Sequence, residues 1–328
     1  MKKKITNKLI IIFGFLPDLI LNILEKTSKL LGYIFFSARK KKNIKSHIYF
    51  QNIDLILNLK KDDNQAHNVY RPLHRKKDTI YELPLISILL EILKKNEHKN
   101  FLDLGAFMGY YSVLLGKLFK ENNLNIYAIE SNPSYCDIIK KNIEENNLSN
   151  VTLINAALSD KNEDLFVSKE SVNTNNFKES IKIRSKTLDE ICNEFSITPD
   201  ILKIDVHGFE GKVLNGFKQN LNNNAKIILL ELHSNKYLKE YSDSNKRKII
   251  EFLINQNYHC FVVPYFGTLN LYKVDKNFLI SKFKNPYRKI NKLNYEDLFF
   301  DKEHTDNLVV AFKDENEINK YSCFLNLD

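Results

Sequence analysis

The sequence predicts an α/β fold: a doubly wound, mostly parallel sheet of seven strands, preceded by a helical extension at the N-terminus. Apolar, strand-like runs alternate with helical periodicity from Tyr81 onward, a pattern typical of a parallel sheet covered by helices on both faces. The chain has 328 residues, enough for one large α/β domain and an appendage. Polar side chains follow several of the predicted strands, where a ligand of such a sheet would bind.

The sheet and its helices are predicted from short apolar runs and from the helical periodicity between them. The predicted strands are residues 100–104, 125–130, 151–154, 201–205, 226–232, 258–263 and 307–312. The predicted helices are residues 83–93, 110–120, 134–146, 187–195, 209–217 and 244–256. We therefore expect a ligand beyond the carboxyl ends of the strands, at the point where the strand order reverses.

The N-terminal region has a different pattern, so we divide the chain into an extension, residues 1–70, and a main domain, residues 71–328. Apolar side chains from Ile20 to Phe35 fall on one helical face, and a lysine-rich run lies on each side of this segment. The apolar run before it is too short to span a bilayer, and no small-x-small cleavage site of a signal peptide follows. The basic helix within residues 1–45 is expected either to contact a membrane surface peripherally or to pack on the main domain.

Composition narrows the choice of partners and compartment. The formal charge of +9 accompanies an enrichment of Lys, Asn and Ile along the whole chain, which indicates compositional bias rather than a nucleic-acid surface. The cysteines Cys136, Cys192, Cys260 and Cys323 form no C-x-x-C pair and no Cys/His cluster. We therefore expect buried free thiols, no metal site, no nucleic-acid partner, and a cytoplasmic location, with peripheral membrane contact left open.

The most informative run extends from Asp103 to Ser112, after the first predicted strand. Gly105 and Gly109 let the backbone approach a ligand closely, and Glu130 ends the next strand, where a carboxylate can accept both hydroxyls of a ribose. The tight pyrophosphate-binding turn of a G-x-G-x-x-G motif is missing, so D-x-G-x-x-x-G favours S-adenosylmethionine over a dinucleotide. Asp103 is expected either to bind the methionine ammonium or its water, or to cap the loop.

Two later runs add candidate residues. After the third predicted strand, small residues leave room for a flat base, with Asn155 or Asp160 as contacts to the adenine amine. Asp205 ends the fourth predicted strand with His207 just beyond it, and His233 follows the fifth strand. Because neighbouring parallel strands end at the same edge of a sheet, we expect Asp205, His207 and His233 to form the catalytic group.

From about Tyr81 to Lys313 the chain resembles the FkbM-type S-adenosylmethionine-dependent methyltransferases. The motifs that carry the resemblance are Phe101–Ser112, Glu130–Pro133, Asn155–Asp160, Leu202–Glu210, Leu230–His233 and Asp306–Val310. This resemblance implies a Rossmann-like class I methyltransferase fold, S-adenosylmethionine as cofactor, and a sugar, glycan or secondary metabolite as acceptor. The chain departs from the family at Phe107, which is usually Asn, and at His207, which is usually Glu. These departures leave open one polar cofactor contact and the identity of the base or of a metal carboxylate.

A hydroxyl group is the acceptor that these residues favour. Its proton must be removed, and Asp205 with His207 or His233 can supply a base. Methyltransferases that act on the exocyclic amines of nucleic-acid bases carry an Asp-Pro-Pro-aromatic type of tetrad where this chain has Asp205-Val206-His207-Gly208. We therefore predict O-methylation, with a nucleic-acid methyltransferase and a non-catalytic, membrane-associated adapter as alternatives. The acceptor itself is not predicted, because residues 168–182 and 264–305 are expected to be loops without a readable code.

Overall fold

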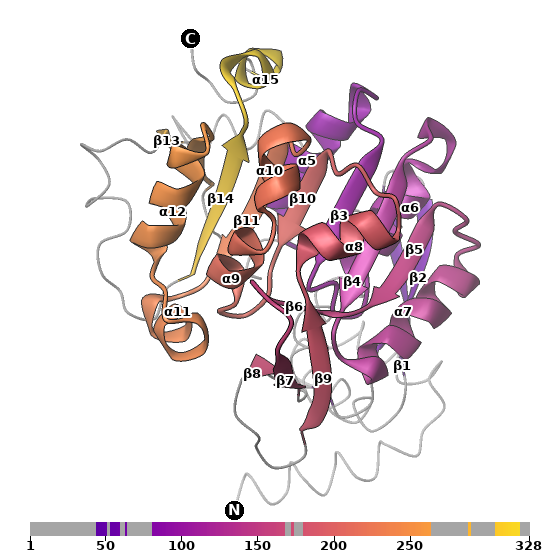
Figure 1. Cartoon of the computed structure of the whole chain (residues 1–328). Helices are drawn as coiled ribbons and strands as arrows, with labels where there is room; N and C mark the ends of the chain where they lie inside the picture. The colour runs from indigo at the N-terminus through magenta and orange to yellow at the C-terminus, as the bar shows by residue number, and fades with distance from the viewer. Residues whose placement is uncertain are drawn as a thin grey trace, which may run out of the picture.

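The computed structural model describes residues 44–50, 53–59, 63, 81–167, 172–173, 180–263, 288–289 and 306–321. The strands of its main sheet are β3 (Asn100–Leu104), β4 (Asn125–Glu130), β5 (Val151–Asn155), β10 (Ile201–Ile204), β11 (Ile227–Leu232), β12 (His259–Val263), β13 (Arg288–Lys289) and β14 (Asn307–Phe312). Their order across the sheet is β13-β12-β14-β11-β10-β3-β4-β5 (Figure 1).

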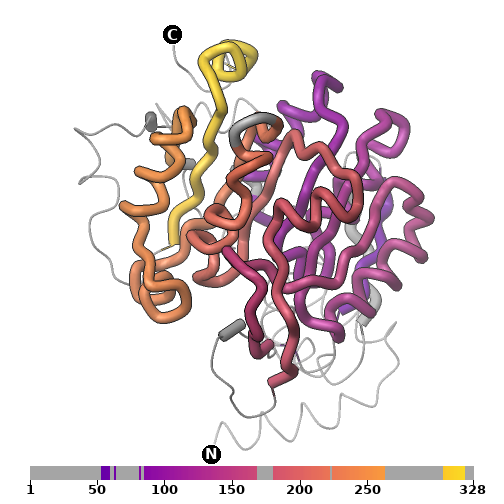
Figure 2. Tube along the Cα trace, viewed as in Figure 1, coloured from indigo at the N-terminus to yellow at the C-terminus, as the bar shows by residue number. Residues whose placement is uncertain are grey.

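The strand order confirms the predicted fold class. Strands β5, β4, β3, β10 and β11 are parallel neighbours, whereas β14 runs antiparallel between β11 and β12. Seven of the eight strands are the predicted ones, and the two-residue β13 adds an edge. The chain builds outward from β3 to β5 and then returns to β10, so the order reverses between β3 and β10. Figure 2 shows the C-terminal segment returning into the other half of the sheet.

Helices cover both faces of the main sheet, as predicted. They are α5 (Leu83–Lys94), α6 (Tyr110–Leu118), α7 (Pro133–Glu145), α8 (Leu188–Glu194), α9 (Glu210–Asn215), α10 (Lys218–Asn223), α11 (Asn235–Ser242), α12 (Lys246–Asn255) and α15 (Glu315–Lys320). Successive strand side chains point to opposite faces, so Phe101 belongs to one hydrophobic cluster and Leu102 to the other. Apolar side chains of α5 and α6 fill the first cluster, and those of α8, α9 and α12 fill the second.

The helix predicted over residues 209–217 corresponds to α9, and α10 follows it beyond the predicted range. The two helices are separated at Gly216, where an added Cβ would lie 2.3 Å from the carbonyl oxygen of Ser159. Close contact between two backbone segments therefore places a glycine at the end of α9. Helix α11 was not predicted; the side chain of Ser234 caps its N-terminus by accepting from the backbone N–H of Tyr237.

A hairpin of β1 (Ile44–Phe50) and β2 (Ile53–Leu59) lies within the segment that the sequence predicted as an N-terminal extension. Leu55, Leu57 and Leu59 are buried in the cluster that also contains α5 and α6. The backbone N–H of Asn58 donates to Asn142 of α7 at 2.6 Å. This part of the extension is therefore packed on the main domain.

A second sheet, in the order β6-β9-β7-β8, begins one residue after β5 and so starts near the carboxyl edge of the main sheet. Its strands are β6 (Ala157–Leu158), β7 (Asp164–Val167), β8 (Val172–Asn173) and β9 (Ile181–Lys186). In Figure 1 it projects from the lower side of the main sheet. Most of the predicted acceptor loops lie outside the described residues.

The predicted amphipathic helix and both lysine-rich runs fall within residues 1–43, outside the described residues. Within the part of the chain that the structure describes, no helix combines the length and the apolarity needed to cross a membrane. Cys136, Cys192 and Cys260 are buried free thiols, as expected.

Candidate active site

Three strand ends meet at the loop that follows β3. The backbone N–H groups of Gly105 and Ala106 both donate to the carbonyl of Ile129, at 3.0 and 3.1 Å. Gly105 has φ +79°, and a Cβ there would lie 1.8 Å from the carbonyl oxygen of Asp205. The positive φ agrees with a loop conformation that requires glycine, and the atom that an added side chain would meet first is backbone of the neighbouring strand end. This glycine therefore holds the ends of β3 and β10 together.

Glu130 closes β4 and is directed at the same loop. Its buried carboxylate accepts from the backbone N–H of Phe107 at 2.9 Å and from that of Asn132 at 2.8 Å. Burial raises the pKa of Glu130 to about 7, against the opposing effect of these hydrogen bonds. The hydroxyl of Ser131 also donates to it, in a long hydrogen bond of 3.4 Å. A carboxylate offers about four lone-pair positions, so one is free for a ribose hydroxyl, and a second becomes free when the Ser131 hydroxyl turns away. The structure thus fits the predicted ribose contact.

Asn155 and Asp160 do not lie in equivalent places. The side-chain amide of Asn155 donates to the carbonyl of Glu130 at 2.8 Å, which puts Asn155 beside the predicted ribose site. Asp160 is exposed, follows β6 of the second sheet, and accepts from the hydroxyl of Ser159 at 3.3 Å. Asn155 therefore lies beside Glu130, whereas Asp160 belongs to the second sheet, and both contacts with the adenine stay predictions.

Asp103 is buried beneath the loop, with 1% of its surface exposed. One carboxylate oxygen accepts from the hydroxyl of Ser112 at 2.7 Å, and the other lies 3.7 Å from the ammonium of Lys203. Burial raises the pKa of Asp103, although Lys203 and Ser112 oppose that rise. The side chain therefore belongs to an internal charge network, and its contact with a methionine ammonium remains a prediction.

Lys203 is the centre of that network, and the sequence analysis gave it no role. Its ammonium is 97% buried, donates to Asp205 at 3.2 Å and lies 4.9 Å from the centre of the Tyr111 ring. Burial would lower the pKa of Lys203, but the carboxylates of Asp205 and Asp103 hold it above its ordinary value. A lysine inside the apolar strand Ile201–Ile204 was the signal that could have identified it.

Glu82 is a second residue that the sequence analysis missed. It precedes α5 with φ +51°, it is buried, and its carboxylate accepts a hydrogen bond from the hydroxyl of Tyr111. Burial raises the pKa of Glu82, and the nearby charge of Lys203 opposes this effect. Through Tyr111 and the charges of Lys203 and Asp205, Glu82 is connected to the buried network beneath the site.

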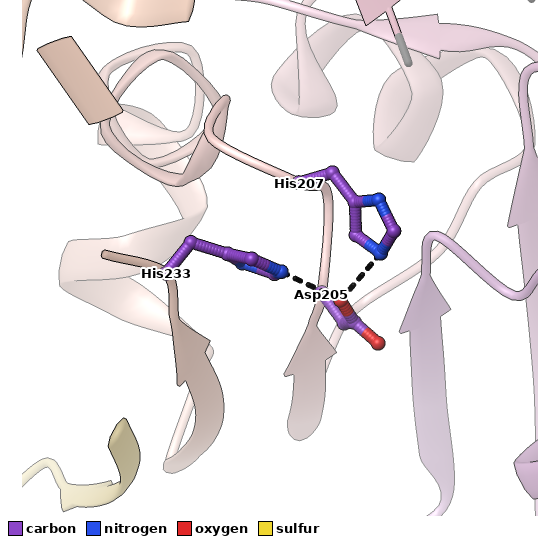
Figure 3. A group of neighbouring side chains, drawn as sticks. All are labelled: Asp205, His207 and His233. Atoms are coloured by element: carbon purple, nitrogen blue, oxygen red, sulfur yellow. Dashed lines mark ion pairs between the residues drawn. The ribbon is translucent and has the colours of Figure 1, made fainter. Parts of the chain in front are cut away.

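The three predicted catalytic residues come together at the ends of β10 and β11 (Figure 3). One carboxylate oxygen of Asp205 lies 3.8 Å from Nε2 of His207 and 3.9 Å from Nε2 of His233. Burial would raise the pKa of Asp205, but Lys203 and both histidines hold it well below its usual range. The side chain of His207 is 39% exposed, whereas that of His233 is buried. The sequence prediction that these three residues form one group is therefore consistent with the geometry.

His233 is anchored from behind by Glu210, the first residue of α9. Nδ1 of His233 and the carboxylate of Glu210 are 2.7 Å apart, and the same oxygen accepts from the backbone N–H of Gly208 at 3.1 Å. Burial would lower the pKa of His233, but Glu210 and Asp205 raise it to about 10. These carboxylates therefore favour the protonated imidazole, which makes His233 poorly suited to act as the base at neutral pH.

A comparison with family models decides the classification. Residues 103–260 match the model described as the methyltransferase FkbM domain. These residues belong to the FkbM methyltransferase family. The match begins at Asp103, ends in β12 and includes Glu130, Asp205 and His233. The family predicted from the sequence motifs is thereby confirmed.

A curated relative of the FkbM methyltransferase domain is a protein-L-isoaspartate O-methyltransferase from Methanococcoides burtonii, 30% identical over 76 residues. The match covers 23% of this chain and spans 37% of that relative's length.

Two methyltransferases are among the solved structures that this chain is similar to. The precorrin-6y C5,15-methyltransferase from Geobacter metallireducens has a TM-score of 0.39 at 16% identity, over 73% of this chain and 93% of its own. The O-methyltransferase TomG from Streptomyces achromogenes, in complex with S-adenosylmethionine, has a TM-score of 0.40 at 11% identity. This match covers 77% of this chain and 91% of the TomG chain. The assignment of the fold rests on the strand order described above.

Proposed function

We propose that this FkbM methyltransferase domain transfers a methyl group from S-adenosylmethionine to a hydroxyl of a sugar, glycan or other small metabolite. The observation that carries the proposal is the group of Asp205, His207 and His233, which lies on the strand ends next to the candidate cofactor loop (Figure 3). A hydroxyl acceptor needs a group of this kind, because its proton must leave as the new bond forms.

The edge formed by β3 and β4 has the residues to hold the cofactor. Glu130 would accept the ribose hydroxyls, the backbone of the Gly105–Gly109 loop would lie against the methionine part, and Asn155 would be near the base. When bound, S-adenosylmethionine supplies a methyl group on a positively charged sulfur, with a neutral leaving group. The chain's main task is to align the acceptor with that methyl, at roughly 3–3.5 Å.

The reaction forms an oxygen–carbon bond to the acceptor while the carbon–sulfur bond breaks and its electron pair stays on sulfur. The acceptor proton is released, and S-adenosylhomocysteine remains. Asp205 places a negative charge beside the reacting hydroxyl and accepts its hydrogen bond. The ring of His207, 39% exposed, gives the proton a route to solvent.

The test is transfer of isotopically labelled methyl groups from S-adenosylmethionine to a panel of glycosides and phenols, with matched amines and RNA as competing acceptors. Labelled ethers are expected, and Asp205→Asn should lower their formation by about 10²–10⁴ while cofactor affinity stays close to wild type. Asp137→Asn, the same chemical change at an exposed position of α7, serves as the matched control. Transfer only to amines or RNA, or full activity of a folded Asp205→Asn protein, would contradict the proposal.

A further inference from the structure

The group of Asp205, His207 and His233 leaves one buried polar atom without a hydrogen bond. Oδ1 of Asp205 is buried and has no hydrogen-bond partner among the described residues. The two imidazole nitrogens that face it lie 3.8 and 3.9 Å away, too far for a hydrogen bond. All three potential donor atoms lie within 4.8 Å of one another. A buried carboxylate oxygen aimed between two imidazoles is an arrangement that a bound cation would complete.

A second observation, independent of these distances, concerns His233. Its Nδ1 is held by the fully buried carboxylate of Glu210 at 2.7 Å, so Nε2 is the nitrogen directed at Asp205. Histidines that bind metals almost always donate their other ring N–H to a carboxylate or a carbonyl, which fixes the ring and raises its basicity. The Glu210–His233 pair has this arrangement before any ion is considered.

We propose that Asp205, His207 and His233 bind a divalent transition-metal ion of the zinc or iron type through Oδ1 and the two Nε2 atoms. A set of two imidazoles and one carboxylate matches catalytic zinc sites and non-haem iron sites. Mg²⁺ prefers oxygen ligands, so this set discriminates against it. Three protein ligands leave a coordination position open for an oxygen of the acceptor.

Metal binding requires the three side chains to close in. Donor atoms bound to Zn²⁺ in a tetrahedral site are separated by roughly 3.4 Å, so each gap to Asp205 exceeds that value by about 0.5 Å. The donor atoms lie within 4.8 Å of one another, so the two imidazole nitrogens must approach by up to about 1.4 Å. Lys203 and Glu210 hold Asp205 and His233 in place, whereas the half-exposed His207 lies in a turn at φ +48° and is the residue that can move. The positive charge of Lys203 opposes metal binding, and the carboxylate of Glu210 favours it.

This inference deepens the proposed function and rests on it for its role in catalysis. At this position a bound ion would orient the acceptor hydroxyl and lower its pKa, and its proton would leave to solvent. Binding itself depends only on the three side chains, so it can be measured without an acceptor or a cofactor.

The test uses the untagged full-length chain, stripped of metal by a chelator and titrated with Zn²⁺ by calorimetry, with the bound metal counted by elemental analysis. One Zn²⁺ per chain is expected. Glu210→Gln should weaken binding by about 10–100-fold, and His207→Gln and His233→Gln should weaken it by more than that. His259→Gln, on β12, is the matched control and should bind as wild type does, and Mg²⁺ should not compete.

Circular dichroism will establish that each variant is folded. His207→Gln is the variant least at risk of misfolding, because the side chain of His207 is half-exposed. No bound Zn²⁺ in the wild-type chain, or equal affinity of folded His207→Gln and His259→Gln, would overturn the metal site. Methyl transfer that survives chelation, with no Zn²⁺ bound, would overturn the site and leave the proposed function standing. Zn²⁺ binding without methyl transfer to any hydroxyl would leave the metal site standing and overturn the proposed function.

Discussion

At the scale of single residues, the site depends on how buried charges compensate one another. Lys203 lies between two carboxylates, 3.2 Å from Asp205 and 3.7 Å from Asp103. All three side chains are largely or fully removed from water, so Asp103 relies on this ammonium for compensation, and Asp205 relies on it together with the two histidines. The sequence predicted the two acids as ligands of a cofactor or acceptor, but it did not predict that they share a buried cation.

Replacement of the cation should therefore be strongly destabilising. Lys203→Met keeps the apolar stem but leaves Asp103 and Asp205 without the ammonium, and breaking a buried ion pair in this way costs about 3–5 kcal/mol. Urea unfolding of Lys203→Met should show a loss of this size in the free energy of unfolding. Lys248→Met, at an exposed position of α12, is the control and should change it little. Equal stabilities of the two variants would show that the network is not needed for the fold.

Glu130 makes cofactor affinity dependent on pH. Its pKa of about 7 lies above the ordinary value of 4.5, so the folded chain binds this proton more tightly than the unfolded chain. Its contribution to stability therefore declines as pH rises between 4.5 and 7. Ribose hydroxyls donate to the carboxylate, so S-adenosylhomocysteine should bind more tightly at pH 8 than at pH 6.

The measurement is calorimetry of S-adenosylhomocysteine across this pH range. Glu130→Gln removes the titrating group, so its affinity should be lower at pH 8 and should vary less with pH. A Glu130→Gln protein with the wild-type pH profile would show that another group sets the profile and that the ribose lies elsewhere.

At the scale of secondary-structure elements, the sequence predicted those whose patterning is local. The strands of the parallel sheet are continuous apolar runs, and β3, β4 and β14 have the predicted bounds. The hairpin of β1 and β2 was missed, because its buried face is completed by α6 and α7, which are distant in the sequence. Helix α10 was not predicted; it begins beyond the predicted range 209–217 and is separated from α9 by Gly216, whose backbone lies close to that of Ser159.

Asn142 joins three of these elements. It is fully buried, its carbonyl oxygen accepts from the backbone and side-chain amides of Asn58 at 2.6 and 2.8 Å, and its amide donates to the carbonyl of Met108 at 2.9 Å. It thereby connects α7 to β2 and to the loop after β3.

Asn142→Ala would leave buried groups of Asn58 and Met108 without partners. Each unsatisfied group costs about 1–3 kcal/mol, so we expect the free energy of unfolding to fall by roughly 2–4 kcal/mol. Asn193→Ala, at an exposed position of α8, provides the comparison in the same denaturation experiment. A loss no larger than that of Asn193→Ala would mean that the hairpin is not fastened to the domain through this side chain.

At the scale of the whole molecule, topology explains why distant motifs form one site. Parallel strands end at the same edge, so residues that follow β3, β4, β10 and β11 gather there. This convergence was predictable, and the meeting of Asp205, His207 and His233 agrees with it. The pairing of His233 with Glu210 was not predictable, because it depends on the direction of side chains on different elements. The membrane role predicted for residues 1–45 stays a prediction, since residues 1–43 lie outside the described structure.

One edge of the sheet is proposed to hold both the cofactor and the group that prepares the acceptor, and a crystal structure of the chain with bound S-adenosylhomocysteine would reveal both. We predict ribose hydroxyls hydrogen-bonded to Glu130 and a cofactor sulfur that faces Asp205, His207 and His233 across a space for the acceptor oxygen. A ribose bound away from Glu130, or a sulfur directed away from these three residues, would rule out this arrangement.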